Sequence, residues 1–564
     1  WDQGLDVYTT QFFPVSNSWD TGTDLAPGWR IHVGLMYGRQ TGWDTVSCQP
    51  DSNRYNYTKT LTRLTFVSPD GTEFEFLDKA TNGAIGALAD EPGCASNQGV
   101  ARGLEWVTTD GTAATFLSDS IIYDTNAAPV QYYGGAQPLL LVNGVVILRD
   151  GTRYRIDNSR VTWAQDRNGN RVNYQYDGYG RVTQITDTLA RSILIAYDVV
   201  DPVSGKTLAA QIQVLGTGGA TRTTKIFRAS LANTLRDGGP VPTNQDLWYA
   251  LDATPGATYN PSLISRVELP SGHAWVFKYN KYAEVTRVET PAGGATEYEF
   301  AAAAADNATL GSTGSGNDRR IMHYLTTRRT YADAASTTKA SRTVYSDPYA
   351  NNLTAGANAV VHEVDYDVVA NSAAHELVHT YSGQPYDFAL DSGSGPSNGT
   401  GYERWLRGKE IQTDEIAYDT GSPVTKSSTV YTWQQLAPVD WATARGVTDV
   451  NLHPQNNPRM TARTTTLYEP SPNLVARTEM QYDQFNNVTD EKVFDYQTLP
   501  LYNGGTPGRL VRETQRSVAR ASANIIQLRI EAMVTNQRRA DRTLSHCLIE
   551  PAVGECREGA IGGA

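Results

Sequence analysis

Two adjacent stretches of the chain decide the fold: VTWAQDRNGNRVNYQYD at residues 161–177 and VTQITDTLARSILIAYD at residues 182–198. Aligned without gaps, they match Tyr176 with Tyr197, and every matched pair is separated by the same 21 positions (197 minus 176). Runs such as RVNYQY and RVTQIT alternate between the two faces of an extended chain, which predicts short strands. Gly, Asn and Asp between these runs predict tight turns. The repeating unit is therefore a β-hairpin.

The same frame returns further along the chain. Close copies occupy 264–280 and 285–300, and looser copies occupy 411–433 and 475–496. A single hairpin cannot bury its apolar face in water, so neighbouring hairpins must stack side by side into a continuous sheet. The sequence thus predicts an all-β chain of stacked hairpins that forms one long, curved or spiralling sheet.

These units resemble a known repeat family. The form YDxxGRVT, seen as YDGYGRVT at 176–183, is similar to the YD or Rhs repeats of bacterial Rhs proteins, toxin-complex shells and teneurins. PGWRIHVGLMYGR (27–39), VSPDGTEFEF (67–76) and LRDGTRYRID (148–157) resemble the strand-turn-strand segments that precede such repeats. The resemblance implies a sheet that spirals into a hollow shell, which in bacterial members often encloses a C-terminal toxic domain. The closing DPxGLxGG segment of such shells is not found in this sequence.

Four segments are expected. Residues 1–150 form an N-terminal β-rich segment that leads into the shell, and 151–300 carry the clear tandem repeats. Residues 301–535 hold divergent repeats with long loops, while 536–564 lose the strand alternation and form an irregular tail.

Bulk properties narrow the range of partners. The net charge is -12, so no basic surface of the size needed for nucleic acid is expected. No run of 18 apolar residues occurs, which predicts no membrane span, and the N-terminus shows no export signal.

The cysteines form two local pairs, Cys48 with Cys94 and Cys547 with Cys556. They suit either two short-loop disulfides in an oxidising compartment or free buried thiols. Glycosylation triplets mark candidate exposed turns without showing that they are modified. Their asparagines are Asn56, Asn307, Asn352, Asn398 and Asn487.

One motif raises the question of catalysis. His375-Glu376-x-x-His379 has the spacing with which a helix presents two zinc ligands and a general base. The flanks argue for strands instead, because 360–369 alternates as a strand and NSAA at 371–374 is typical of a turn. A strand would hold the two imidazoles about 13 Å apart and turn Glu376 to the opposite face. A zinc hydrolase therefore stays a remote alternative.

Other candidate sites have a structural and a functional interpretation each. The Gly/Ser-rich stretches 311–318 and 391–401 suit solvated loops better than phosphate cradles, since they lack the lysine and following helix. Asp365 and Asp367 should face the same way on one strand, an arrangement expected by coincidence among 60 acidic residues; the alternative is a pair that binds a cation or sugar.

The recurring tyrosines should build cross-strand aromatic ladders, with the adjacent Asp capping each turn, or else bind carbohydrate. This set comprises Tyr176, Tyr197, Tyr279, Tyr298, Tyr418 and Tyr482.

The sequence thus favours a non-enzymatic scaffold that is secreted or displayed on the cell surface, with no catalytic, cofactor or metal-ligating residues. In the first interpretation it is the shell of a secreted polymorphic toxin, and its partner is an encapsulated C-terminal toxin. In the second it is an adhesin or self-assembling fibre subunit that binds carbohydrate or pairs with other copies through its exposed sheet edges.

Overall fold

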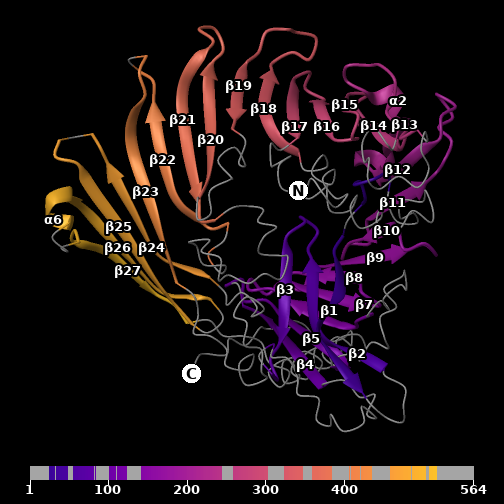
Figure 1. Ribbon diagram of the computed structural model, residues 1–564. Coiled ribbons are helices and arrows are strands. Elements are labelled where there is room, and N and C mark those ends of the chain that lie inside the picture. The colour runs from indigo at the N-terminus through magenta and orange to yellow at the C-terminus, as the bar shows by residue number, and fades with distance from the viewer. Residues whose placement is uncertain are drawn as a thin grey trace, which may run out of the picture.

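The structure is a computed structural model, shown in Figure 1, that describes most of the repeat region and parts of the N-terminal region. The described residues are 25–31, 33–48, 55–81, 83, 101–109, 111–123, 141–243, 258–302, 323–346, 358–383, 406, 408–419, 421–434, 458–469, 471–483, 486–503 and 507–517.

The described chain is almost entirely β-strand. The strands are β1 (Leu35–Cys48), β2 (Tyr55–Val67), β3 (Glu73–Asp78), β4 (Ala101–Thr108), β5 (Thr115–Tyr123), β6 (Gly144–Ile147), β7 (Arg153–Asp157), β8 (Arg160–Gln165), β9 (Arg171–Tyr176), β10 (Val182–Thr186), β11 (Ser192–Tyr197), β12 (Leu208–Leu215), β13 (Thr221–Ser230), β14 (Ser262–Glu268), β15 (Ala274–Tyr279), β16 (Val285–Glu289), β17 (Ala295–Ala302), β18 (His323–Tyr331), β19 (Ser341–Tyr345), β20 (Ala359–Asp367), β21 (Ser372–Tyr381), β22 (Glu410–Ala417), β23 (Val424–Gln434), β24 (Arg459–Leu467), β25 (Leu474–Tyr482), β26 (Val488–Thr498) and β27 (Leu510–Gln515). The helical elements are a 3-10 turn at Thr217–Gly219, α2 (Leu231–Thr234) and α6 (Leu499–Asn503).

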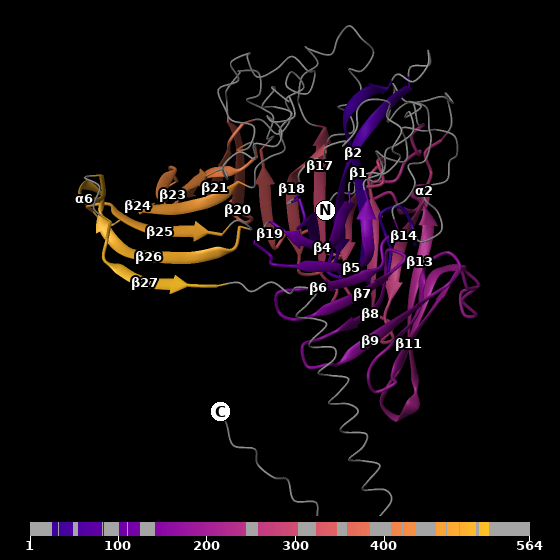
Figure 2. The same ribbon diagram turned by 90° about the horizontal axis from the view of Figure 1, so that it is seen from below.

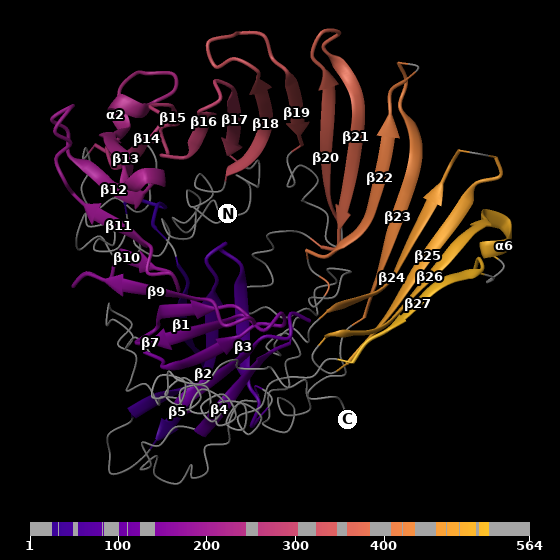
Figure 3. The same cartoon turned by 180° about the vertical axis from the view of Figure 1, so that it is seen from behind.

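All 27 strands belong to one sheet, in which each strand pairs antiparallel with the next along the chain. A further pairing joins β1 to β8 at Leu35 and Arg160. The sheet therefore turns on itself over its first eight strands and then continues outward. Figures 1 and 3 show that the continuing strands β9–β27 sweep round in a broad arc. The predicted all-β architecture of one long, curved sheet of stacked hairpins is confirmed.

One apolar core lies within strands β1–β8, and a second lies in the first part of the arc. The N-terminal core consists of Met36, Leu64, Phe66, Phe76, Trp106, Ala114, Phe116, Ile122, Val142, Val146, Ile156 and Val161. The second core, which we call the arc core, consists of Leu25, Ala26, Val33, Val182, Ile195, Ala209, Ala210, Ile226, Leu231, Tyr259, Leu263, Ile264, Phe277 and Tyr279. The segment that precedes β1 thus packs on one face of β10–β16, where Trp29 meets Phe277 edge to face at 4.8 Å between ring centroids.

The second part of the arc has a different interior chemistry. In the described residues of β18–β27, the buried apolar side chains are Ala359, Ala462 and Val475, and the other buried side chains are polar. These strands are joined by their backbone ladders and by ion pairs such as Arg329 with Glu299. The described part of this region therefore has no large apolar core of its own, although half-buried apolar side chains such as Val361 and Leu377 lie among the polar ones.

The far end of the arc meets the N-terminal strands where the β25–β26 turn contacts the β4–β5 turn. A Cβ atom placed on Gly111, in the β4–β5 turn, would lie 2.6 Å from the backbone oxygen of Asn486, in the β25–β26 turn. Asn486 and Asn487 are buried in spite of lying in a turn. Figure 2, the view from below, shows β25 and β26 at the left extending toward β4 and β5. This contact closes the arc into a ring.

Strand predictions agree closely with the structure. The run RVNYQY is β9 at Arg171–Tyr176, and the copy at 285–300 contains β16 and β17. The predicted turn at 371–374 is shorter than expected, because β21 already begins at Ser372.

Several predictions lie partly or wholly outside the described residues. The side chain of Cys48, the other three cysteines, both Gly/Ser-rich stretches and the 536–564 tail belong to this group. Of the glycosylation triplets, Asn487 is only 2% exposed, so the expectation of an exposed turn is wrong there. No helix in the described ranges is long and apolar enough to span a bilayer.

Candidate functional site

An Asp that follows a repeat tyrosine can organise the next turn. Oδ1 of Asp177 accepts hydrogen bonds from the backbone N–H groups of Tyr179 and Arg181, each at 2.9 Å. The predicted role of this Asp as a turn cap is confirmed at Asp177 and at Asp483, whereas Asp198 pairs with Arg181 and Arg228 instead. Asp187, within a repeat, caps its turn in the same way, and the Arg191 side chain lowers the pKa of Asp187 by bonding its other oxygen.

The tyrosine hydroxyl fastens the open end of its own hairpin. Tyr197 in β11 donates to the backbone oxygen of Val182 in β10 at 2.8 Å, and Tyr279 in β15 donates to Ile264 in β14 at 2.7 Å. Tyr176 donates in the same way to Val161, and Tyr482 to Met460. Burial raises the pKa of Tyr197 to about 12, so this donor stays protonated across the ordinary pH range.

An arginine packs on several of these rings. The guanidinium carbon of Arg181 lies 4.3 Å from the ring centre of Tyr197, and the same side chain pairs with Asp177 and Asp198. Arg160 and Arg459 stack similarly on Tyr176 and Tyr482. The predicted tyrosine ladder is not what the described contacts show: the rings of Tyr176, Tyr197 and Tyr482 meet arginine side chains, Tyr279 lies in the arc core, and the hydroxyl groups bond backbone oxygen atoms.

The His375-Glu376-x-x-His379 motif lies on a strand, as its flanks predict. His375 pairs with Asp365 on β20 and Ala417 on β22, and His379 pairs with Val361 and Thr413. His375 therefore shares a face with His379, while Glu376 faces the other way.

Each member of the motif has its own local partner. His379 Nδ1 lies 2.5 Å from a carboxylate oxygen of Glu410, and His375 Nε2 lies 3.3 Å from Glu415. These histidines are thus held by separate carboxylates on β22. Within the described part of the chain, no group of three or more His, Cys, Asp or Glu side chains is arranged to hold a metal ion.

Glu376 is the buried member of the motif and acts as a double acceptor. His362 Nδ1 on β20 lies 2.6 Å from one carboxylate oxygen, and the Tyr418 hydroxyl donates to the other. The bond to Glu376, with burial, raises the pKa of Tyr418 to about 12. A carboxylate with two internal partners fixes β20, β21 and the end of β22 to one another.

The acidic pair on β20 does not act as a pair. Asp365 accepts a 2.7 Å hydrogen bond from Thr343 on β19. Asp367 instead caps the β20–β21 turn through the N–H groups of Val369 and Ala370, which lower its pKa. The extra residue at the neighbouring register shift is Ala374 of β21, so Asp365 and Asp367 remain two positions apart on β20, but their separate contacts do not support one binding pair.

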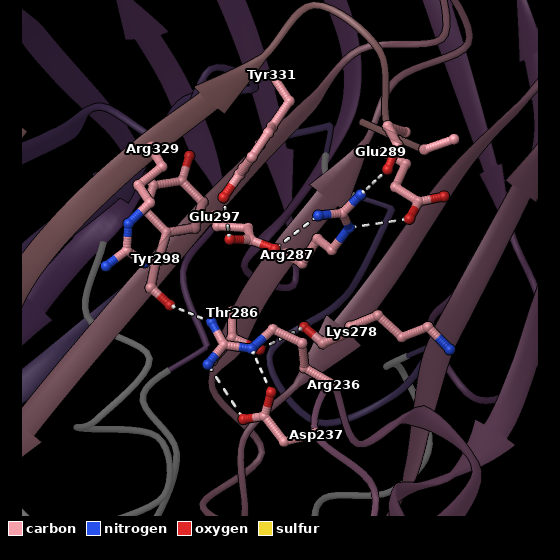
Figure 4. Close-up of polar contacts among 12 residues, drawn as sticks. Arg236, Asp237, Lys278, Thr286, Arg287, Glu289, Glu297, Tyr298, Arg329 and Tyr331 are labelled. Atoms are coloured by element: carbon pink, nitrogen blue, oxygen red, sulfur yellow. Dashed lines mark hydrogen bonds and ion pairs between the residues drawn. The ribbon is translucent and has the colours of Figure 1, made fainter. Parts of the chain in front are cut away.

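A charged network, shown in Figure 4, covers the neighbouring strands β16–β18. Arg287 bonds Glu289 at 2.9 Å and Glu297 at 2.6 Å, and Tyr331 donates to Glu297 at 2.8 Å. Beside it, Arg329 holds Glu299 and lowers the pKa of that carboxylate.

Register places this network on the face opposite the arc core. Arg287 lies opposite Glu297, and Glu297 lies opposite Arg329, so all three share a face. Phe277 of the arc core lies opposite Val288, one position along from Arg287 and hence on the other face. The network therefore joins three strands laterally where the other face carries apolar packing, and its charges are mutually paired rather than directed at a shared reacting centre.

Sequence reasoning missed two features. An arginine stands before the first valine of the two tandem copies, as Arg160 before Val161 and Arg181 before Val182, and gives a usable signal there. The contact of Gly111 with Asn486 has no signal in the sequence, because it joins turns far apart along the chain.

No protein-family model and no curated protein matches the chain. Several solved structures resemble it at low sequence identity. A Photorhabdus luminescens Tc holotoxin pore with a TccC3 mutation is 11% identical over 81% of this chain, with a TM-score of 0.17. A TcdB2-TccC3-Cdc42 structure is 10% identical over 79%, with a TM-score of 0.16. TcdB2-TccC3 without its hypervariable C-terminal region is 10% identical over 84%, with a TM-score of 0.17.

This chain spans 19% to 22% of the length of those three chains. The account of the fold rests on the strand pairing of the chain itself.

Proposed function

We propose that the chain is the shell part of a secreted, toxin-type protein: a non-enzymatic β scaffold that encloses or presents a cargo carried C-terminal to the sheet. The observation that supports this most is the single 27-stranded sheet, which curves until its last hairpins meet its first ones. The Tyr-Asp repeats resemble those of shell-forming proteins, which agrees with the proposal.

The mechanism is physical. A wall of hydrogen-bonded strands blocks the approach of proteases, and a cargo inside it is shielded without any chemical step. The polar second half of the arc suits a hydrated or incompletely folded cargo, because it offers no apolar core with which such a chain would aggregate.

The test is protection of a tethered reporter. A short, protease-labile polypeptide is fused after Ala564 of the full chain, and its cleavage rate is compared with that of the same polypeptide fused to an unrelated globular carrier. The proposal expects the reporter to be cleaved roughly tenfold more slowly on this chain, since protection scales with the fraction of time it is exposed. Equal rates on the two carriers would contradict it.

A second candidate is a self-assembling surface fibre or adhesin, and one observation favours it. The last described strand, β27, pairs with β26 on one side only, and its Leu510 and Val511 are 43% and 58% exposed. An exposed edge strand can add another strand. Analytical ultracentrifugation distinguishes the two: a single species of one chain favours the shell, and concentration-dependent growth favours the fibre.

A further inference from the structure

We propose that the ring opens and closes at one place, the contact between the β4–β5 turn at Gly111 and the β25–β26 turn at Asn486 and Asn487, which we call the seam. The inference rests on the proposed function, because a shell that holds a cargo needs a passage for it. It adds where that passage lies and which residues control it.

Pairing around the sheet singles out the seam as its weakest junction. Every strand from β1 to β27 shares a backbone ladder with its neighbour in sequence. Parting β21 from β22, for example, would break the ladder that runs from His375 to Tyr381. Across the seam, in contrast, none of the described strands β24–β27 pairs with β1–β9. Two turns in contact can separate without the loss of any strand ladder.

Gly111 permits the close approach at the seam. Its φ of +86° lies in the left-handed region, and a Cβ atom there would lie 2.6 Å from the Asn486 oxygen and 3.4 Å from its carbonyl carbon. Both are backbone atoms, which cannot rotate away as a flexible side chain can. Any larger residue at position 111 must therefore push the two turns apart.

The opposite turn keeps its own shape. Asp483 accepts from the backbone N–H of Asn487 at 2.9 Å and from its side-chain amide at 2.8 Å. These bonds lie within the turn and survive separation of the seam. The turn can therefore act as a rigid latch.

Closing the seam also costs free energy, because it buries a polar atom that has no hydrogen-bond partner in the described part of the chain. Asn487 is 2% exposed, and its Oδ1 atom is buried with no hydrogen-bond partner among the described residues. The matching residue of an earlier turn, Asn170, makes the same two bonds to Asp166 and is exposed. Opening the seam would let water reach the Asn487 oxygen, which favours the open state and keeps the closed contact reversible.

The first test compares two glycine substitutions in the full chain. Gly111→Ala places a methyl group in the seam. Gly71→Ala, in the β2–β3 turn, is the matched control: its φ is +85°, and a Cβ there meets nothing within 4 Å. The two variants thus share their backbone strain and differ in the seam. We expect Gly111→Ala alone to increase the radius of gyration measured by small-angle X-ray scattering. It should also speed cleavage of the fused reporter roughly tenfold, the change produced by about 1.4 kcal/mol of lost closing energy.

The second test locks the seam. A Thr112→Cys, Asn486→Cys double variant leaves Gly111 in place and puts two thiols beside the contact, where a disulfide needs Cα atoms about 4.4–6.8 Å apart. Oxidation should form the cross-link and slow reporter cleavage below the wild-type rate, and a reductant should restore that rate. Wild-type protein treated with the same oxidant and reductant controls for the native cysteines.

The outcomes separate this inference from the proposed function. If the wild-type chain protects the reporter but Gly111→Ala matches Gly71→Ala and the lock changes nothing, the seam proposal is overturned and the shell stands. If the wild-type chain gives no protection, the shell fails, and scattering alone decides the seam. Equal radii of gyration for the two alanine variants would then overturn it as well.

Discussion

At the scale of single residues, the hydroxyl group of the repeat tyrosine joins the two strands of its hairpin by donating to a backbone oxygen. The recurrence of Tyr and the turn-capping role of Asp are both visible in the sequence. The partner of the hydroxyl group is not, because it is a backbone oxygen fifteen residues earlier in three of the four pairs, as in Tyr279 with Ile264. A repeat shows which side chain recurs, but a contact with the main chain depends on how the hairpin closes.

Removing one buried hydroxyl group should weaken the fold measurably. Tyr279→Phe keeps the ring but leaves the Ile264 oxygen without its 2.7 Å donor in the arc core, where Tyr279 is 1% exposed. We expect a loss of about 1–2 kcal/mol in the free energy of unfolding, measured in urea. Tyr179→Phe, at an exposed position, is the control and should change it little. Equal effects of the two substitutions would contradict the account.

Acid should destabilise the protein through its turn carboxylates. The pKa of Asp187 is lowered by Arg191, that of Asp166 by Asn170, and that of Glu491 by Arg516. A folded-state pKa below the unfolded value means that the stabilisation is present above about pH 4 and is lost as the pH falls through the folded-state values.

The midpoint of thermal unfolding, followed from pH 7 to pH 2.5, should therefore hold steady and then fall below about pH 4. Asp187→Asn removes one of these groups and should make the fall shallower. A midpoint that rises on acidification would be the opposite of this expectation.

At the scale of elements, the alternation of side chains and the turn residues predict where most strands lie, but they do not predict the β-bulges. The register shift between Asp365 and Tyr366 alters which side chains share a face, and no residue pattern announces it. The histidine motif shows what alternation can decide. Its spacing alone suggests a zinc helix, yet the flanking strands place it on β21, where Glu376 belongs to a different face.

The strand geometry of this motif predicts how the chain meets zinc. His375 and His379 lie about 13 Å apart along β21, each beside its own carboxylate, so they cannot share an ion. After dialysis against zinc, metal analysis should find the same zinc content in wild type and in His379→Ala. One zinc per chain in the wild type, lost in a well-folded His379→Ala variant, would restore the hydrolase interpretation.

At the scale of the whole molecule, the sequence predicts a long, curved sheet but not where it closes. Curvature accumulates from the twist of many strands, and the turns that finally meet at Gly111 and Asn486 carry no complementary motif. The division of the interior also emerges only at this scale: the two apolar cores belong to β1–β8 and to the first part of the arc, while the described residues of β18–β27 bury few apolar side chains.

The central claim is that one chain forms one closed ring of sheet, and single-particle electron microscopy of the isolated chain tests it most directly. The account predicts class averages of a single ring in which the β4–β5 turn touches the β25–β26 turn. Averages that show an open or straight ribbon, or a ring assembled from several chains, would contradict it.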